Sequence, residues 1–190
     1  MGRTVILASK SPGRRLLLEE AGFEVLIRPT GTDEEHMKES VEKSARLLAL
    51  RKLEAFLREQ PSPAHPVIAS DTLLAFGKIE LGQPGNRNDA FAQLRLLSGN
   101  THHVYSAWAV WAKGEIHQGC DRCAVTFRTL SDEEIEAYLD TGEWVGAAGS
   151  YRYQGRGKEL VQSTSGDETT VIGLPMNQIS GILSEALPDR

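Results

Sequence analysis

The sequence predicts an α/β layer fold with a mixed sheet. Short β-branched and apolar runs typical of buried strands alternate with segments whose apolar residues recur at helical spacing. Two longer strand-like runs, at residues 103–112 and 115–127, meet at Lys113-Gly114, a pair typical of a hairpin turn. Helix start signals stand among the strand-like runs, as in the capping box Ser131-Asp-Glu-Glu134. Crossover helices together with a central hairpin indicate a mixed sheet.

The N-terminal part of the chain is expected to form a strand, a helix, a second strand and a long helix. The first strand covers residues 4–8, and Ser11 can cap a helix that ends at Gly22. The second strand covers residues 24–28. After a polar loop, Ser40 begins the long helix.

The rest of the chain is expected to continue the alternation. Residues 67–76 are strand-like, and we expect Ser70-Asp71-Thr72 to interrupt this strand. A carboxylate inside an apolar run is costly unless it meets a cation or metal, or the strand ends just before it. Besides the hairpin, the expected elements are a loop at 82–85, a helix at 88–97, a helix from Ser131 to Gly142, glycine-rich loops at 146–157 and a last helix after Pro175.

Composition and charge are those of an ordinary globular protein. The 190 residues suit one domain or two closely fused lobes. A net charge of −5 gives no reason to expect long nucleic acid or an anionic membrane as partner, whereas a small anionic substrate needs only a few local cations. Only two cysteines, no signal-peptide core and no apolar run of about 18 residues favour a cytoplasmic protein.

The turn at Ser9-Lys-Ser-Pro-Gly-Arg14 is the first segment that can carry chemistry. It runs into a helix start, where free N–H groups and the helix dipole favour an anion, and its hydroxyls and arginine are donors suited to phosphate. The alternative is a plain capped helix with surface arginines.

Acidic residues form the second segment. Asp71 lies in an apolar run, and Asp33-Glu34 lies in an earlier polar loop. Two carboxylates from separate loops, completed by waters and phosphates, would suit Mg²⁺ or Mn²⁺. The alternative is a turn aspartate that caps backbone N–H groups.

The third segment is the glycine-rich stretch at residues 149–157. Its glycines let the backbone approach a ligand, and Gln154 can hydrogen-bond a base edge or a phosphate. A flexible surface loop is the alternative.

Together these segments resemble the Maf family of nucleotide pyrophosphatases. The resemblance implies a single Maf-like domain over residues 1–190, because the matching motifs keep their order along nearly the whole chain. They are Leu7-Ala-Ser-Lys-Ser-Pro-Gly-Arg14, Asp33-Glu34, Lys52, Ile68-Ala-Ser-Asp71-Thr72, Leu97-Ser-Gly-Asn-Thr-His102, Thr126-Phe-Arg-Thr-Leu-Ser-Asp-Glu-Glu-Ile135, Ala148-Gly-Ser-Tyr151, Gln154-Gly155 and Val171-Ile-Gly-Leu-Pro175.

The family resemblance also implies an architecture and an activity. The fold is an elongated mixed sheet flanked by helices, with two lobes around a central cleft, usually in a homodimer. The activity is the release of pyrophosphate from a nucleoside triphosphate with a divalent metal, Mg²⁺ or Mn²⁺. By position, the metal ligands are Glu34 and Asp71, the residue that activates water is also Asp71, and the substrate-binding residues are Ser9, Ser11, Arg14, Lys52 and Gln154.

Three departures from the family pattern remove cations. Gly13, Gln83 and Gly146-Ala147 stand where family members commonly carry arginine or lysine. Two of these are plausible phosphate contacts, and a lost charge-assisted hydrogen bond is worth roughly 1.5–3 kcal/mol. Losing both in the transition state would slow the reaction roughly a hundred- to ten-thousandfold. Cations elsewhere could compensate, namely Arg15, Lys78, Arg87, Arg152 or Arg156.

Cysteine and histidine pairs in the central strands are expected to be structural. Cys120 and Cys123 are three apart in a strand, so their side chains point to opposite faces and do not converge on a metal. His102 and His103 are neighbours and also diverge, which suggests one packed and one surface residue.

Two functional hypotheses follow. The retained acids favour an enzyme, whereas the lost cations favour a nucleotide-binding regulator of division or another process with weak or no turnover. A nucleic-acid-binding module fits poorly with the negative charge. The substrate stays open between pyrimidine nucleotides such as dTTP and UTP, which Gln154-Gly155 favours, and 7-methyl-GTP, which Gly13, Ser70-Asp71 and Ala148-Gly-Ser-Tyr151 favour.

Overall fold

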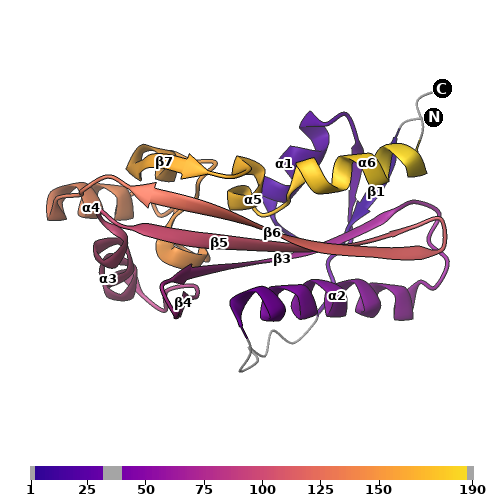
Figure 1. Cartoon of the computed structure of the whole chain (residues 1–190), viewed down its shortest axis with the longest axis horizontal. Helices are drawn as coiled ribbons and strands as arrows, with labels where there is room; N and C mark the ends of the chain where they lie inside the picture. The colour runs from indigo at the N-terminus through magenta and orange to yellow at the C-terminus, as the bar shows by residue number, and fades with distance from the viewer. Residues whose placement is uncertain (1–2, 32–39, 188–190) are drawn as a thin grey trace. The chain divides into compact units, whose positions relative to one another are not determined.

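A computed structural model describes residues 3–31 and 40–187. The strands of this part of the chain form one seven-stranded sheet in the order β2-β1-β3-β5-β6-β7, with β4 paired to β3 (Figure 1). β1 is parallel to β2 and β3, whereas β4 and β7 are antiparallel to β3 and β6. The predicted mixed α/β sheet is therefore confirmed. The strands are β1 (Thr4–Leu7), β2 (Glu24–Ile27), β3 (Val67–Phe76), β4 (Ile79–Leu81), β5 (Thr101–Ala112), β6 (Glu115–Phe127) and β7 (Val161–Ser165).

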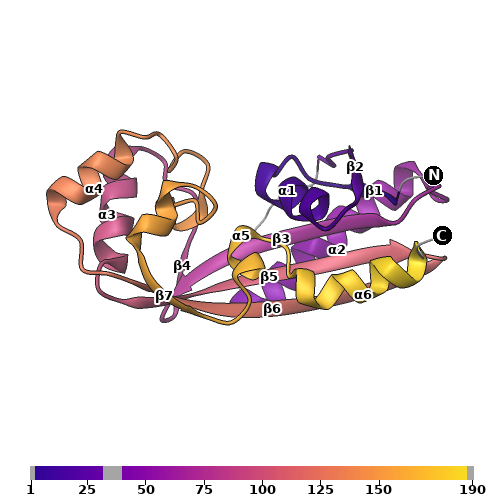
Figure 2. The ribbon, with the colours of Figure 1, turned by 90° about the horizontal axis from the view of Figure 1, so that it is seen from above.

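Helices flank the sheet, as predicted. They are α1 (Pro12–Glu20), α2 (Val41–Glu59), α3 (Arg87–Leu97), α4 (Asp132–Leu139), α5 (Glu168–Ile172) and α6 (Met176–Ala186), with short 3-10 turns η1 (Ala148–Ser150) and η2 (Arg156–Leu160). α2 lies against one face of β3 and β5, and α1 and α6 lie on the other face (Figures 1 and 2). Across the described ranges, no helix combines the length and the apolar character needed to cross a bilayer.

The chain divides into two compact units, and three of the four division points fall inside β3, β5 and β6, while the fourth follows α5. Of the described residues, unit 1 comprises 3–31, 40–72, 106–121 and 173–187, and unit 2 comprises 73–105 and 122–172. In unit 1, buried residues of β1, α2, β3 and β5 pack into one core, with Leu53 fully buried in it. In unit 2, α3, α4 and the strands share a larger core around Phe127. The two-lobe arrangement about a cleft stays a prediction.

The local signals read from the sequence are confirmed at several turns. Ser11 and Ser40 cap α1 and α2 by accepting from backbone N–H groups. Lys113 and Gly114 both have positive φ, 53° and 88°, as a two-residue hairpin turn between β5 and β6 requires. The capping box of α4 is present with both of its hydrogen bonds, from Ser131 and from Glu134.

The expected interruption of the third strand is wrong. β3 runs unbroken from Val67 to Phe76, with Ser70 and Asp71 both buried. Burial is tolerated because the Ser70 hydroxyl lies 2.7 Å from the Ala107 carbonyl and an Asp71 carboxylate oxygen lies 2.6 Å from the Lys52 ammonium. β4, β7 and α5 were not predicted. They are short, and the sequence of β7, Val-Gln-Ser-Thr-Ser, lacks apolar alternation.

Candidate active site

The centre of the candidate site is a buried ion pair between β3 and α2. Asp71 Oδ1 lies 2.6 Å from Lys52 Nζ, and the two side chains are only 10% and 13% exposed. Lys52 stands in the middle of α2, one residue before the fully buried Leu53, so the core contacts of α2 fix where its side chain begins. The sequence predicted both residues as site members, and the structure brings them together.

The second oxygen of Asp71 lacks a partner. Asp71 Oδ2 is buried and makes no hydrogen bond within the described part of the chain. Leaving a buried acceptor unsatisfied costs about 1–3 kcal/mol, and more for a charged group. Asp71 is therefore suited to accept a hydrogen bond from water or substrate, or to ligate a cation, through this oxygen.

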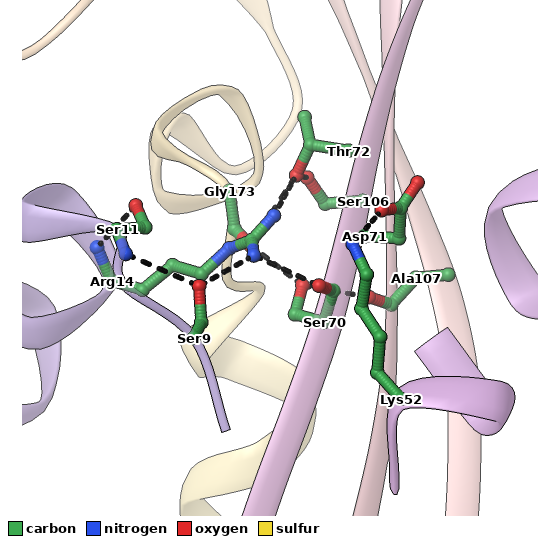
Figure 3. Close-up of polar contacts among 10 residues, drawn as sticks. All are labelled: Ser9, Ser11, Arg14, Lys52, Ser70, Asp71, Thr72, Ser106, Ala107 and Gly173. Carbon is green, nitrogen blue, oxygen red and sulfur yellow. Dashed lines mark hydrogen bonds and ion pairs between the residues drawn. The ribbon is translucent and has the colours of Figure 1, made fainter. Parts of the chain in front are cut away.

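A second cluster surrounds Arg14 at the start of α1. The Arg14 guanidinium donates to the Ser9 hydroxyl at 3.1 Å, to the Ser70 carbonyl at 2.8 Å, to the Thr72 hydroxyl at 3.0 Å and to the Gly173 carbonyl at 2.9 Å (Figure 3). Ser9 Oγ also accepts from the Ser11 backbone N–H at 3.2 Å. The structure thus joins the predicted residues Ser9, Ser11 and Arg14 in one network.

The two clusters lie on opposite sides of β3. Side chains alternate along a strand, so Ser70 and Thr72 point to one face and Asp71 points to the other. Figure 3 shows Arg14 and Gly173 on the side of Ser70 and Thr72, and Lys52 on the side of Asp71. The predicted phosphate-binding role of Ser9, Ser11 and Arg14 stays a prediction.

Two predicted site residues cannot be placed beside these clusters. Glu34, together with Asp33, lies outside the described residues. Gln154 is exposed and belongs to unit 2, in the segment between η1 and η2. Their roles as metal ligand and substrate contact stay predictions. Within residues 3–31 and 40–187, no group of three His, Cys, Asp or Glu side chains could hold a metal alone.

Sequence reasoning missed two residues that hold the cluster around Arg14. Ser106 of β5 hydrogen-bonds Thr72 through its hydroxyl at 2.8 Å, and the carbonyl of Gly173 accepts from both Arg14 and Ser70. Ser106 is fully buried. A hydroxyl among apolar neighbours in the strand run was the available signal for Ser106, and Gly173 lies inside a motif already matched to the family.

In unit 2, a group of loop contacts surrounds the motif at residues 148–151. Gly82 accepts through its carbonyl from the Gly149 N–H at 3.2 Å and from Gln93 Nε2 at 3.2 Å, while Gln93 Oε1 accepts from the Ser150 hydroxyl at 2.6 Å. Ser150 is fully buried with φ of 64°, a conformation that non-glycine residues rarely adopt. The hydrogen bond from its hydroxyl helps to hold this strained backbone in place.

The histidine expectation is confirmed. His102 is fully buried, with Nε2 2.8 Å from the Tyr151 hydroxyl, whereas His103 is partly exposed. Burial, with a smaller effect from His103, lowers the pKa of His102 to about 4, so its ring is neutral near pH 7. Burial also raises the pKa of Tyr151 well above its usual value. Cys120 and Cys123 are both free thiols, Cys123 buried and Cys120 half-buried, and their purely structural role stays a prediction.

Most of the candidate compensating cations already have protein partners. Arg15 pairs with Glu19, Arg156 pairs with Glu159, and Arg87 pairs with Glu136 and Asp140. Arg152 donates to the carbonyls of Glu143 and Val145. Lys78 is exposed in the turn between β3 and β4.

Comparison with known proteins agrees with the order of the motifs. The family profile described as "Maf-like protein" matches residues 4–186. A dTTP/UTP pyrophosphatase of Cupriavidus pinatubonensis is 36% identical, covering 95% of each chain. Proteins with the same name from Pyrococcus horikoshii and Bacillus anthracis are 36% and 37% identical, over 92% and 93% of this chain and 92% of each of theirs. The family match spans the buried Asp71–Lys52 pair and the Arg14 network, and this chain belongs to the Maf-like protein family.

Proposed function

We propose that this chain hydrolyses a pyrimidine nucleoside triphosphate, dTTP or UTP, to the monophosphate and pyrophosphate. The observation that carries the proposal is Asp71, a carboxylate that pairs with Lys52 through one oxygen and has no hydrogen-bond partner for the other among residues 3–31 and 40–187. Relatives over almost the full length bear the name dTTP/UTP pyrophosphatase, which favours the pyrimidine substrates over 7-methyl-GTP.

A divalent metal, Mg²⁺ or Mn²⁺, fits the donors present. Asp71 Oδ2 is a hard carboxylate oxygen, the kind of ligand these ions prefer, and it is buried with no hydrogen-bond partner among the described residues. Asp71 would hold the ion together with Glu34, which is predicted from the family resemblance. When bound, such an ion neutralises charge on phosphate oxygens and lowers the pKa of bound water.

Asp71 and Lys52 would together supply water activation and phosphate binding. In the absence of substrate, the Lys52 ammonium and the Asp71 carboxylate neutralise each other's buried charge. When a triphosphate approaches, the Lys52 ammonium can donate to a phosphate oxygen as well as to Asp71, because it has three N–H donors. The Asp71 carboxylate can accept a proton from the attacking water through Oδ2, or orient that water by a hydrogen bond. Positioning and charge neutralisation are the main requirements of phosphoryl transfer.

A nucleotide-binding regulator with weak or no turnover is the second candidate. The observation that favours it is the absence of cations at Gly13, Gln83 and Ala147. The experiment that separates the candidates is a panel of dTTP, UTP, 7-methyl-GTP and the common purine triphosphates, with Mg²⁺ or Mn²⁺. The panel measures pyrophosphate release and nucleotide affinity. Binding without release supports the regulator, and faster release from 7-methyl-GTP than from dTTP or UTP contradicts the proposed substrates.

We also expect a cytoplasmic homodimer. The family resemblance supports the dimer, and the two free cysteines are in keeping with a reducing compartment. Light scattering coupled to size-exclusion chromatography measures the mass against 20.8 kDa for one chain. Cell fractionation tests the location.

A further inference from the structure

Arg14 already has protein acceptors for most of its hydrogen-bond donors. A guanidinium has five N–H donors, and four of them point at Ser9 Oγ, the Ser70 carbonyl, Thr72 Oγ1 and the Gly173 carbonyl, all within 3.1 Å. To bind a phosphate with a bidentate fork, Arg14 would have to release at least one of these four acceptors. Two of the four acceptors are backbone carbonyls of the buried residues Ser70 and Gly173, where losing the donor costs about 1–3 kcal/mol.

The acceptors of Arg14 lie on both sides of Asp71 in the chain. Arg14 contacts the residue before Asp71 through a backbone carbonyl and the residue after it through a hydroxyl. The Ser70 hydroxyl in turn lies 2.7 Å from the Ala107 carbonyl and 2.8 Å from the Gly173 carbonyl, so its proton is shared between two acceptors. The Thr72 hydroxyl lies 2.8 Å from that of Ser106. β3 is therefore fixed on either side of the residue whose carboxylate points to the opposite face.

The local backbone at Gly173 is fitted to this network. Gly173 has φ of 119°, which L side chains rarely adopt. A Cβ at this position would lie 3.0 Å from Thr72 Oγ1 and 3.2 Å from Arg14 Nε. The glycine lets the chain pass close to the guanidinium while its carbonyl accepts from Arg14. The packing of three separate segments is thus matched to an arginine at position 14.

We propose that Arg14 is a positioning residue and does not bind the phosphates. Arg14 holds β3 through the face opposite the Asp71 side chain, and so keeps the Asp71 carboxylate beside Lys52. The proposal rests on the proposed function of Asp71. It replaces the role that the family resemblance implied for Arg14. A carboxylate that is misplaced by about 1 Å can lower a rate by roughly a hundredfold without changing how the substrate is held.

The first test separates kcat from KM. Arg14→Lys and Arg14→Ala should lower kcat for dTTP or UTP by about ten- to a hundredfold, with KM within about threefold of wild type. Thr72→Val keeps Arg14 and removes only a hydroxyl in the network, so it should lower kcat in the same way. Arg15→Ala, an exposed arginine paired with Glu19, is the matched control and should match wild type. A tenfold or larger rise in KM for Arg14→Lys, with Thr72→Val unchanged, would overturn the proposal.

A second measurement does not depend on turnover. Mn²⁺ titration followed by electron paramagnetic resonance should show weaker binding in Arg14→Lys and Thr72→Val by about fivefold or more, because both changes loosen Asp71. Unchanged Mn²⁺ affinity in both variants would also overturn the proposal. If wild type binds Mn²⁺ but releases no pyrophosphate from any nucleotide, the proposed function fails, and this titration still decides whether Arg14 positions Asp71. Thr72→Val serves where an Arg14 variant does not fold.

Discussion

Replacing Asp71 by asparagine tests the proposed chemistry most directly. The asparagine keeps the shape of the side chain and can still accept a hydrogen bond from Lys52 through its amide oxygen. It loses the negative charge that a metal needs and the basicity that could activate water. The unpartnered Oδ2 position becomes, in one amide orientation, an N–H₂ donor facing the place where a cation or water proton is expected.

The structure gives two magnitudes for this variant. Loss of a general base alone lowers rates by about a hundred- to ten-thousandfold, and loss of the metal ligand adds to this. Breaking a buried ion pair costs about 3–5 kcal/mol in stability. With 10% and 13% of the two side chains exposed and one hydrogen bond retained, we expect a cost of about 3 kcal/mol. For a chain of this size, this corresponds to a fall in Tm of about 6–12 °C.

Pyrophosphate release from dTTP or UTP is measured at a temperature well below the Tm of the variant, with circular dichroism to show that it is folded. Asp140→Asn is the matched control, because Asp140 is exposed and pairs with Arg87. We expect a folded Asp71→Asn protein with a rate at least a hundredfold below wild type, and an Asp140→Asn protein at the wild-type rate. A wild-type rate from folded Asp71→Asn would show that the catalytic role is misassigned.

Three further predictions concern unit 2. Burial lowers the pKa of His102 from 6.5 to about 4, so its ring takes up a proton more readily in the unfolded chain than in the folded one. The free energy of unfolding is therefore highest above pH 6.5 and falls by up to about 3 kcal/mol as the pH is lowered toward 4. Urea unfolding across this range should show a shallower pH dependence in His102→Phe, and an unchanged dependence contradicts the assignment. Ser131→Ala removes one half of the capping box of α4 and should lower the free energy of unfolding by about 1 kcal/mol, whereas Ser131→Asp should retain most of it. Gln83→Lys restores an exposed cation and should raise kcat/KM by about tenfold if this loop has its family role. A kcat/KM equal to that of wild type at both low and high salt would argue against a phosphate contact at this position.

The elements with strong local signals could be predicted from the sequence. The caps at Ser11, Ser40 and Ser131 and the turn at Lys113-Gly114 depend on residues within a few positions of one another. The polar edge strand β7 could not be predicted, because it lacks apolar alternation and pairs with the distant strand β6.

In the candidate site, too, features that depend on distant residues could not be predicted from the local sequence. The cost of a carboxylate in an apolar run can be avoided by a break in the strand or by a cation, and the local sequence does not decide between them. The partner Lys52 and the acceptors of Ser70 are 19 or more positions away in the chain. The expected break in the strand also hid the geometry of the site. In an unbroken strand, Ser70 and Asp71 must face opposite ways, which separates Arg14 from Lys52.

The two positions of unit 2 that lack a cation, Gln83 and Ala147, lie in two loops that contact each other. Gln83 follows Gly82, and Ala147 precedes the residues that donate to Gly82 and Gln93. The two loops are thus joined by neutral hydrogen bonds beside both positions. Effects of neighbouring residues on one ligand are not independent, so the two losses should not be multiplied. For Gln83 and Ala147 taken together, we expect a penalty close to that of one lost contact, about ten- to a hundredfold. Because Ala147 is only 7% exposed, its replacement by lysine would disturb packing, which makes exposed Gln83 the position where the charge can be restored without that cost.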